Sequence, residues 1–204
     1  LAQACKTHNS KLVHYSTDYV FSGTLLRPIR EDDATAPASV YGKTKLAGEL
    51  AIRDAGCSHF IFRTAWLYAA RGQNFLRTAL KLAKERDELR IVNDQIGSPT
   101  PARWLAVATA LAVNKDFDAS GTWHVAADGE CSWHKFAQSI YQEALSSGLL
   151  AKAPRLVGLP SHEYPTKAKR PMYSRLDCGL FYRDFGLQLP DWRLGLNQVL
   201  AEMV

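Results

Sequence analysis

Short apolar runs that alternate with helical patterns are the feature that most restricts the fold of this chain. The runs suited to buried strands are residues 11–16, 59–68 and 89–92. The apolar spacing between them predicts helices over 40–54 and 74–88, the first capped by Ser39 and ended by Gly56. Strands that alternate with helices form parallel βαβ units covered on both faces. We therefore predict an α/β protein with a doubly wound parallel sheet.

The alternation loosens after about residue 120, where Pro, Trp and Tyr become frequent. The remaining predicted elements are helices over 102–113, 132–146 and 190–203, a strand over 122–126, and a short helix between Asp177 and Gly186. This change is typical of a smaller lobe that closes over a cleft.

Composition excludes several classes of function. The net charge is +5, and the longest basic run is residues 167–170, so we predict no nucleic-acid partner. No apolar run approaches the roughly 18 residues of a membrane helix. The four cysteines are scattered without a C-x-x-C pair, which disfavours a zinc site or disulfide framework and indicates a reducing cytoplasm. The histidines also lack metal-binding spacing.

Polar residues follow two of the predicted strands. They are Ser16-Thr17-Asp18-Tyr19 and Arg63-Thr64-Ala65-Trp66. Because ligands bind at the carboxyl ends of the strands in such sheets, both groups should face one crevice.

Tyr41 and Lys45 lie one turn apart on the predicted helix, whose buried face should include Leu46, Leu50 and Ala51. A free phenol, with a pKa of about 10, is a weak proton donor at neutral pH. A nearby ammonium favours the phenolate, so Lys45 could tune Tyr41, and the Thr17 hydroxyl could hold a substrate oxygen beside it. The spacing alone is weak evidence, because 8 Tyr and 11 Lys among 204 residues predict about 0.4 such pairs by chance. The Tyr41–Lys45 pair lies on a helix between two predicted buried strands, which strengthens its interpretation as a proton-transfer site.

Seven segments in order along the chain carry a family resemblance: STDYVFSG (16–23), VYGKTKLAGE (40–49), FRTAWLY (62–68), NDQIGSPT (93–100), GTWHVAADGECSW (121–133), RPMYSRLD (170–177) and PDWRLGL (190–196). They resemble the dTDP-4-dehydrorhamnose reductase family of extended short-chain dehydrogenases/reductases. The resemblance implies NADPH- or NADH-dependent reduction of the 4-keto group of dTDP-4-dehydro-β-L-rhamnose to dTDP-L-rhamnose. That step belongs to the cytoplasmic biosynthesis of rhamnose for lipopolysaccharide or cell-wall polysaccharide.

The resemblance also implies a division of the chain. Residues 1–118 would be the C-terminal part of a Rossmann-like NAD(P)-binding domain, with 66–101 partly contributing to the substrate cleft. Residues 119–204 would form a smaller α/β substrate-binding lobe.

Carried over position by position, Tyr41 becomes the proton donor and Lys45 the residue that tunes it and binds the nicotinamide ribose. Thr17 completes the catalytic trio. Tyr15 falls where the strand meets the nicotinamide, and the sugar contacts fall on Asp18 and Trp66.

A nucleotide-sugar pyrophosphate requires cationic partners, which arginine supplies in a bidentate manner. Arg170 and Arg175 are the candidates, with Arg63 less favoured. For each, the alternative is a surface or interdomain salt bridge.

The chain departs from the family pattern in two ways. It has no G-x-x-G-x-x-G turn to cradle the cofactor pyrophosphate. We therefore expect that the first half of the dinucleotide domain is missing, that this polypeptide alone is inactive, and that the activity belongs to a longer protein. Some members bind Mg²⁺ through glutamates at a dimer interface, but Arg103 stands where one glutamate is expected, so we predict no metal. A homodimer is compatible with the resemblance.

Two other functions stay open. One is a related nucleotide-sugar epimerase or dehydratase, although Tyr19 rather than Glu follows Thr17-Asp18. The other is a non-catalytic regulatory subunit of the methionine adenosyltransferase type, which the missing glycine-rich turn would suit. Retention of Thr17, Tyr41 and Lys45 disfavours that second interpretation.

Overall fold

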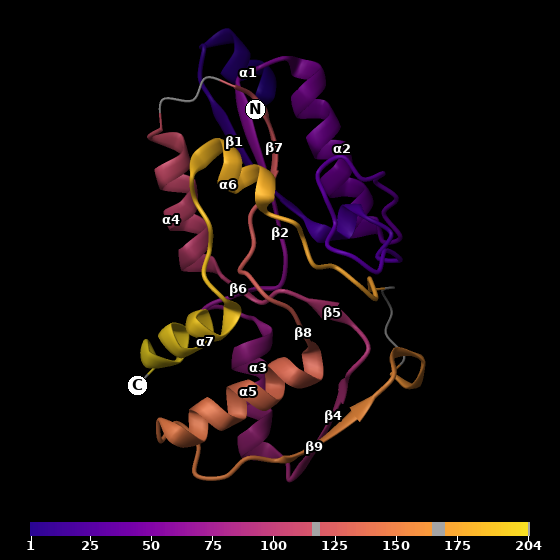
Figure 1. Cartoon of the computed structure of the whole chain (residues 1–204), viewed down its shortest axis with the longest axis vertical. Helices are drawn as coiled ribbons and strands as arrows, with labels where there is room; N and C mark the ends of the chain where they lie inside the picture. The colour runs from indigo at the N-terminus through magenta and orange to yellow at the C-terminus, as the bar shows by residue number, and fades with distance from the viewer. Residues whose placement is uncertain (116–118, 165–169, 204) are drawn as a thin grey trace.

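A three-stranded parallel sheet forms the upper half of the molecule (Figure 1). The computed structural model describes residues 1–115, 119–164 and 170–203. The strand order is β1-β2-β7, and the strands are β1 (Leu12–Thr17), β2 (His59–Thr64) and β7 (Gly121–His124). Thr17 pairs with Thr64, so the polar ends of β1 and β2 lie side by side as predicted.

Helices cover both faces of this sheet, which confirms the predicted layers. Phe60 and Phe62 pack against the helices of one face, whereas Ile61, which points the other way, packs with residues of the opposite face. The first pair of helices is α4 (Ala102–Val113) and α6 (Gly179–Phe185); the second is α1 (Ala2–Thr7) and α2 (Val40–Ala55). The period of two along β2 therefore fixes which helix covers which face.

A second hydrophobic core occupies the lower half of Figure 1. Its helices are α3 (Phe75–Glu85), α5 (Trp133–Ser146) and α7 (Trp192–Ala201). They pack beside a two-stranded parallel sheet of β4 (Glu88–Val92) and β9 (Arg155–Leu159). The sequence did not predict β9, because its RLVGL pattern is short, interrupted by glycine and only half-buried.

Short elements connect the two halves. They are β3 (Leu67–Tyr68) paired with β6 (Thr100–Pro101), β5 (Ile96–Gly97) paired with β8 (Cys131–Ser132), and the 3-10 turns η1 (Asp18–Val20) and η2 (Ser161–Glu163). Each half draws on both sides of the predicted 118/119 boundary, since β7 and α6 pack with the upper core. Residue 118 lies outside the described residues, so that boundary stays a prediction.

Two predictions about these elements were wrong. The run 59–68 is not one strand, because Trp66 has a φ of +47° and turns the chain out of β2 into β3. The buried face of α2 is formed by Gly42, Glu49 and Ile52, whereas Leu50 is 48% exposed. Leu46 packs against a core cluster as predicted, but Leu50 and Ala51 do not lie on the buried face, because a glutamate occupies its centre.

No helix within the described ranges has both the length and the apolar character needed to cross a membrane.

Replacing either glycine of α2, Gly42 or Gly48, with alanine should change the free energy of unfolding, but in opposite directions. Gly→Ala in a helix ordinarily stabilises by about 0.5–1 kcal/mol. We expect Gly48→Ala to do so, because its methyl group would lie 3.7 Å from His14 Nε2, an ordinary contact. Gly42→Ala would place its methyl group against the Tyr19 carbonyl oxygen and should lower the free energy of unfolding by about 1–3 kcal/mol.

Urea denaturation followed by circular dichroism measures both variants. Equal stabilities for the two would contradict the close approach of α2 to η1.

Candidate active site

Tyr41 and Lys45 are presented by the first two turns of α2. The Ser39 hydroxyl accepts a hydrogen bond from the Gly42 amide at 3.1 Å, so the helix begins at Val40 as predicted. Lys45 Nζ donates a hydrogen bond to the Tyr15 carbonyl oxygen on β1. The Tyr41 side chain is left open to solvent, and the residue is 54% exposed.

Thr17 ends β1 and caps the turn that follows. Its Oγ1 accepts a hydrogen bond from the Tyr19 amide at 3.2 Å and donates one to Asp18 Oδ1 at 2.9 Å. The Tyr19 ring meets the Tyr41 ring edge-on, with 5.7 Å between the centroids. The structure therefore gathers Tyr41, Lys45 and Thr17 around residues 15–19, at the carboxyl end of β1.

Asp18 lies behind Thr17 and is only 2% exposed. Burial raises the pKa of Asp18 to about 6, although hydrogen bonds from Thr17 and Ser174 oppose the rise. Its Oδ2 has no partner among the described protein atoms. Its Oδ1 accepts the hydrogen bond from the Thr17 hydroxyl, and its predicted contact with the sugar stays a prediction.

The Tyr15 side chain leaves β1 on the face opposite α2. Its hydroxyl donates a hydrogen bond to Thr109 Oγ1 of α4 at 2.9 Å. The residue is partly exposed at the same strand that Lys45 contacts through the backbone. Its predicted place beside a nicotinamide stays a prediction.

A buried charge cluster that the sequence did not predict lies beneath this site. Glu49 accepts hydrogen bonds from Arg63 Nε at 2.9 Å, Arg63 Nη2 at 2.7 Å and the Ser16 hydroxyl at 2.5 Å. Glu49 is also 3.1 Å from the more exposed Arg53. Arg63, a minor candidate for substrate binding, is thus held inside the protein. One feature of the sequence could have predicted this cluster: Glu49 lies four residues after Lys45 and eight after Tyr41, on the same side of the helix.

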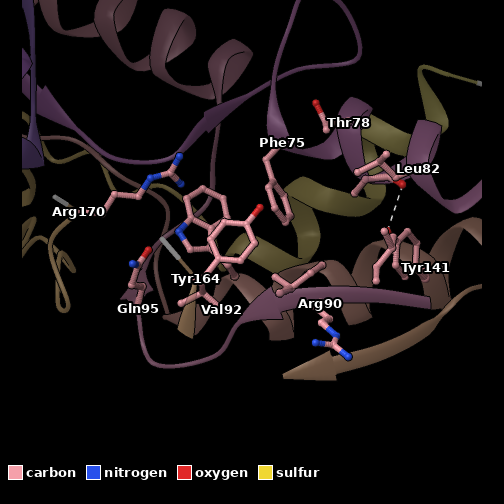
Figure 2. Close-up of a pocket in the computed structure, with 13 residues that line it drawn as sticks. Phe75, Thr78, Leu82, Arg90, Val92, Gln95, Tyr141, Tyr164 and Arg170 are labelled. Carbon is pink, nitrogen blue, oxygen red and sulfur yellow. Dashed lines mark hydrogen bonds between the residues drawn. The ribbon is translucent and has the colours of Figure 1, made fainter. Parts of the chain in front are cut away.

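A cavity of about 290 Å³ lies in the lower half, between α3, β4 and α5 (Figure 2). Its aromatic residues are Phe75, Trp133, Tyr141 and Tyr164, and its polar lining includes Gln95 and Arg170. Tyr164 and Arg170 both line the cavity (Figure 2). Aromatic walls with a few polar groups are typical of a pocket for a flat, polar ligand.

Arg170 differs from Arg90, the other arginine that lines this cavity, in its effect on Tyr19. It lines the cavity, and its positive charge also lowers the pKa of Tyr19, although burial is the stronger effect and raises that pKa overall. Tyr19 in turn contacts Tyr41. Of the predicted run 167–170, only Arg170 lies within the described residues.

Arg175 lies elsewhere. Its guanidinium is 3.5 Å from both Asp128 and Glu130, and it lines a different hollow beside α6. The structure therefore does not bring the two predicted arginines together.

Trp66 stacks on Trp133 with 3.5 Å between the ring centroids and 4° between the planes. Trp133 also contacts Phe75 in the cavity wall. The predicted sugar contact is thus part of an aromatic row that leads from the end of β2 to the cavity.

Within residues 1–115, 119–164 and 170–203, no three His, Cys, Asp or Glu side chains gather as a metal site would require. Arg103, which stands where a metal-binding glutamate was expected, pairs with Glu202 at 3.2 Å.

A parallel sheet covered on both faces, with a Tyr-x3-Lys pair at its carboxyl edge, defines a protein of the short-chain dehydrogenase/reductase class. Comparison with known sequences is consistent with this class. The sequence model of the RmlD substrate binding domain matches residues 1–204. The chain belongs to that family.

Curated relatives and solved structures agree. The dTDP-4-dehydrorhamnose reductase of Salmonella typhimurium is 47% identical over 207 residues, covering 100% of this chain and 69% of the relative. The reductase of Escherichia coli K12 is 45% identical with the same coverage. A Clostridium acetobutylicum dTDP-4-dehydrorhamnose reductase superposes with a TM-score of 0.92 at 35% identity, covering 100% of this chain and 69% of that one.

The corresponding reductase from Bacillus anthracis, solved in complex with NADP, has a TM-score of 0.90 at 36% identity, covering 98% of this chain and 69% of that chain. These structures confirm the predicted Rossmann-like fold class and the predicted family.

The buried Asp18 carboxyl predicts a pH-dependent stability. Its pKa is near 3.8 in an unfolded chain and about 6 in the folded protein. The folded state therefore binds more protons between these values, and the contribution of Asp18 is full below pH 3.8 and lost as the pH rises through 6. Asparagine does not titrate, so Asp18→Asn should gain about 2–3 kcal/mol relative to the wild type between pH 4 and pH 7.

Chemical denaturation at a series of pH values measures this difference. A constant difference between the two proteins would show that folding leaves the pKa of Asp18 unshifted.

Proposed function

We propose that this chain carries the proton-transfer site and the nucleotide pocket of an NAD(P)H-dependent reductase, which converts dTDP-4-dehydro-β-L-rhamnose to dTDP-L-rhamnose. The relatives at 45–47% identity bear the name of that reductase. The observation that carries the proposal is the convergence of Tyr41, Lys45 and Thr17 on residues 15–19, in a molecule whose lower half holds an aromatic cavity lined by Arg170. In this proposal the base of the substrate binds in the cavity, its pyrophosphate binds Arg170, and its sugar extends toward Tyr41.

The reduced nicotinamide supplies a hydride to the keto carbon when it is bound. Tyr41 then serves as the proton donor: its exposed hydroxyl gives a proton to the oxygen that becomes the new alcohol. Lys45 is held one turn away by the Tyr15 carbonyl, and its positive charge favours the phenolate left after proton transfer.

The local groups fit a nicotinamide ribose. An ammonium has three N–H donors, and the Tyr15 carbonyl accepts only one of those of Lys45. The other two are available for ribose hydroxyls. No glycine-rich turn occurs in the 204 residues, so the chain itself contains no such cradle for the cofactor pyrophosphate.

Thr17 assists by orienting the keto oxygen. Its hydroxyl proton is directed to Asp18 Oδ1 while that carboxyl is ionised. A protonated Asp18 can instead donate to Thr17, which frees the threonine proton for the substrate oxygen. The Asp18 pKa of about 6 makes both states accessible.

The cavity supports the choice of a nucleotide sugar. Base rings stack on aromatic side chains, which the cavity supplies in Phe75, Trp133 and Tyr164. Arg170 offers a guanidinium fork for the diphosphate. Trp66 ends the aromatic row nearest β2, where the sugar would lie.

We place this reductase in the cytoplasm and include a homodimer in the proposal. All four cysteines are free thiols, which suits a reducing compartment.

Tyr41→Phe removes the proposed proton donor and should lower kcat about 10²–10⁴-fold, measured as NADPH oxidation with the keto sugar in the whole protein that carries this sequence. Tyr182→Phe, which removes a hydroxyl from a residue of similar exposure (58%) on α6, should leave kcat unchanged. Near-normal turnover by Tyr41→Phe would exclude this role.

Arg170→Ala tests the nucleotide pocket. Loss of a charge-assisted contact should weaken dTDP binding to this chain about 10–100-fold, measured by calorimetry or tryptophan fluorescence. Arg175→Ala should weaken it less, because Asp128 and Glu130 hold that guanidinium at another hollow. A larger effect for Arg175 would reverse the assignment.

A further inference from the structure

We propose that Glu49 is a positioning residue which, through Ser16 and Arg63, sets the register of α2 on β1 and so places Tyr41 and Lys45 opposite Thr17. This inference rests on the proposed function for its kinetic consequence. Its geometric part concerns the fold alone and is tested separately.

The contacts of α2 with β1 follow one another along the strand. Lys45 binds the Tyr15 carbonyl oxygen, and Glu49, one helical turn later, accepts the Ser16 hydroxyl at 2.5 Å. Thr17, the next residue of β1, carries the catalytic hydroxyl. Three consecutive strand residues therefore fix Lys45, Glu49 and the reacting group relative to one another.

Arg63 makes this contact rigid. It comes from β2, the neighbouring strand, and holds both carboxylate oxygens of Glu49, at 2.9 and 2.7 Å. The Arg63 and Glu49 side chains are 2% and 0% exposed. A bidentate pair favours one relative orientation of its planes, and two buried side chains have little freedom, so the pair restrains rotation and sliding of α2.

Because α2 is a continuous helix, the position of Glu49 also determines the positions of Lys45 and Tyr41. Residues 41, 45 and 49 lie at intervals of four and share one side of α2. A shift of Glu49 along β1 therefore moves Lys45 and Tyr41 with it. The close approach of Gly42 to the Tyr19 carbonyl anchors the first turn as well. Two anchors, one near each end, define where the phenol lies.

The charge state of Glu49 is consistent with a permanent anchor. Burial alone would raise the pKa of Glu49, but the hydrogen bonds and charge of Arg63, with those of Ser16 and Arg53, lower it below its usual value. The carboxylate therefore stays ionised across the working pH range and does not itself exchange protons with the site.

Ser16→Ala is the sharpest test. Replacing Glu49 would leave Arg63 buried without its carboxylate, and such a variant can fail to fold. Ser16→Ala removes only the hydroxyl that joins Glu49 to β1. We expect kcat to fall by roughly tenfold or more because the reacting groups lose their alignment, while KM for the nucleotide sugar changes less than twofold.

Thr122→Val is the matched control. Thr122 belongs to the same cluster, since its Oγ1 accepts a hydrogen bond from Arg53 at 2.9 Å, but it lies on β7 and does not join α2 to β1. Its kcat should equal that of the wild type. An unchanged kcat in Ser16→Ala, or equal losses in both variants, would overturn the positioning role.

The second measurement does not depend on turnover. 3-Fluorotyrosine is incorporated into this chain, and the Tyr41 ¹⁹F resonance is identified by its loss in Tyr41→Phe. Ser16→Ala should shift or broaden that resonance, whereas Thr122→Val should leave it in place. If the whole wild-type protein that carries this sequence reduces no keto sugar but the resonance moves as expected, the proposed function fails and the geometric inference stands. An unmoved resonance overturns the inference whatever the activity.

Discussion

The ion pair between Glu49 and Arg63 is the interaction on which the rest of the site depends. It joins α2 to β2, and through Ser16 to β1, inside a region from which water is excluded. Removing one partner of such a pair costs about 3–5 kcal/mol, because the other charge stays buried alone. An apolar pair could hold the helix against the sheet, but it would not fix one orientation. The pair therefore contributes a defined geometry more than it contributes net stability.

The aromatic row has a different task, because Trp66 packs both against the core of the lower half and against the cluster that includes Val20 and Ala65. The halves meet through short strand pairs and through the segment that follows Arg170, where Ile96 exchanges backbone hydrogen bonds with Met172 and Ser174. That segment is bonded to Gly23 through Tyr173 as well. A ligand that spans the cavity and the end of β1, as proposed above, would contact residues of both halves, and its binding would then depend on how the two halves are placed.

Much of this arrangement could be predicted from the sequence, because it depends on local rules. The Ser39 cap, the Gly56 stop and the Tyr41–Lys45 spacing need only the neighbouring residues. What could not be predicted depends on distant ones. The burial of Glu49 requires Arg63 from another strand, the break at Trp66 requires its stack with Trp133, and β9 is a strand only because β4 pairs with it. A pattern read along the chain contains none of these partners.

The left-handed backbone of Trp66 has a consequence for how this position can vary among homologues. A bulky residue with positive φ is strained by about 1–3 kcal/mol, which glycine would relieve. Glycine at position 66 would also abolish the stack on Trp133. The Trp66 indole lies directly against Gly97, where an added methyl group would be 2.5 Å from the ring, so this space accepts only a flat side chain from residue 66. A substitution of Trp66, Gly97 or Trp133 is therefore tolerated only if the other two residues also change. We expect these three positions to vary together among homologues.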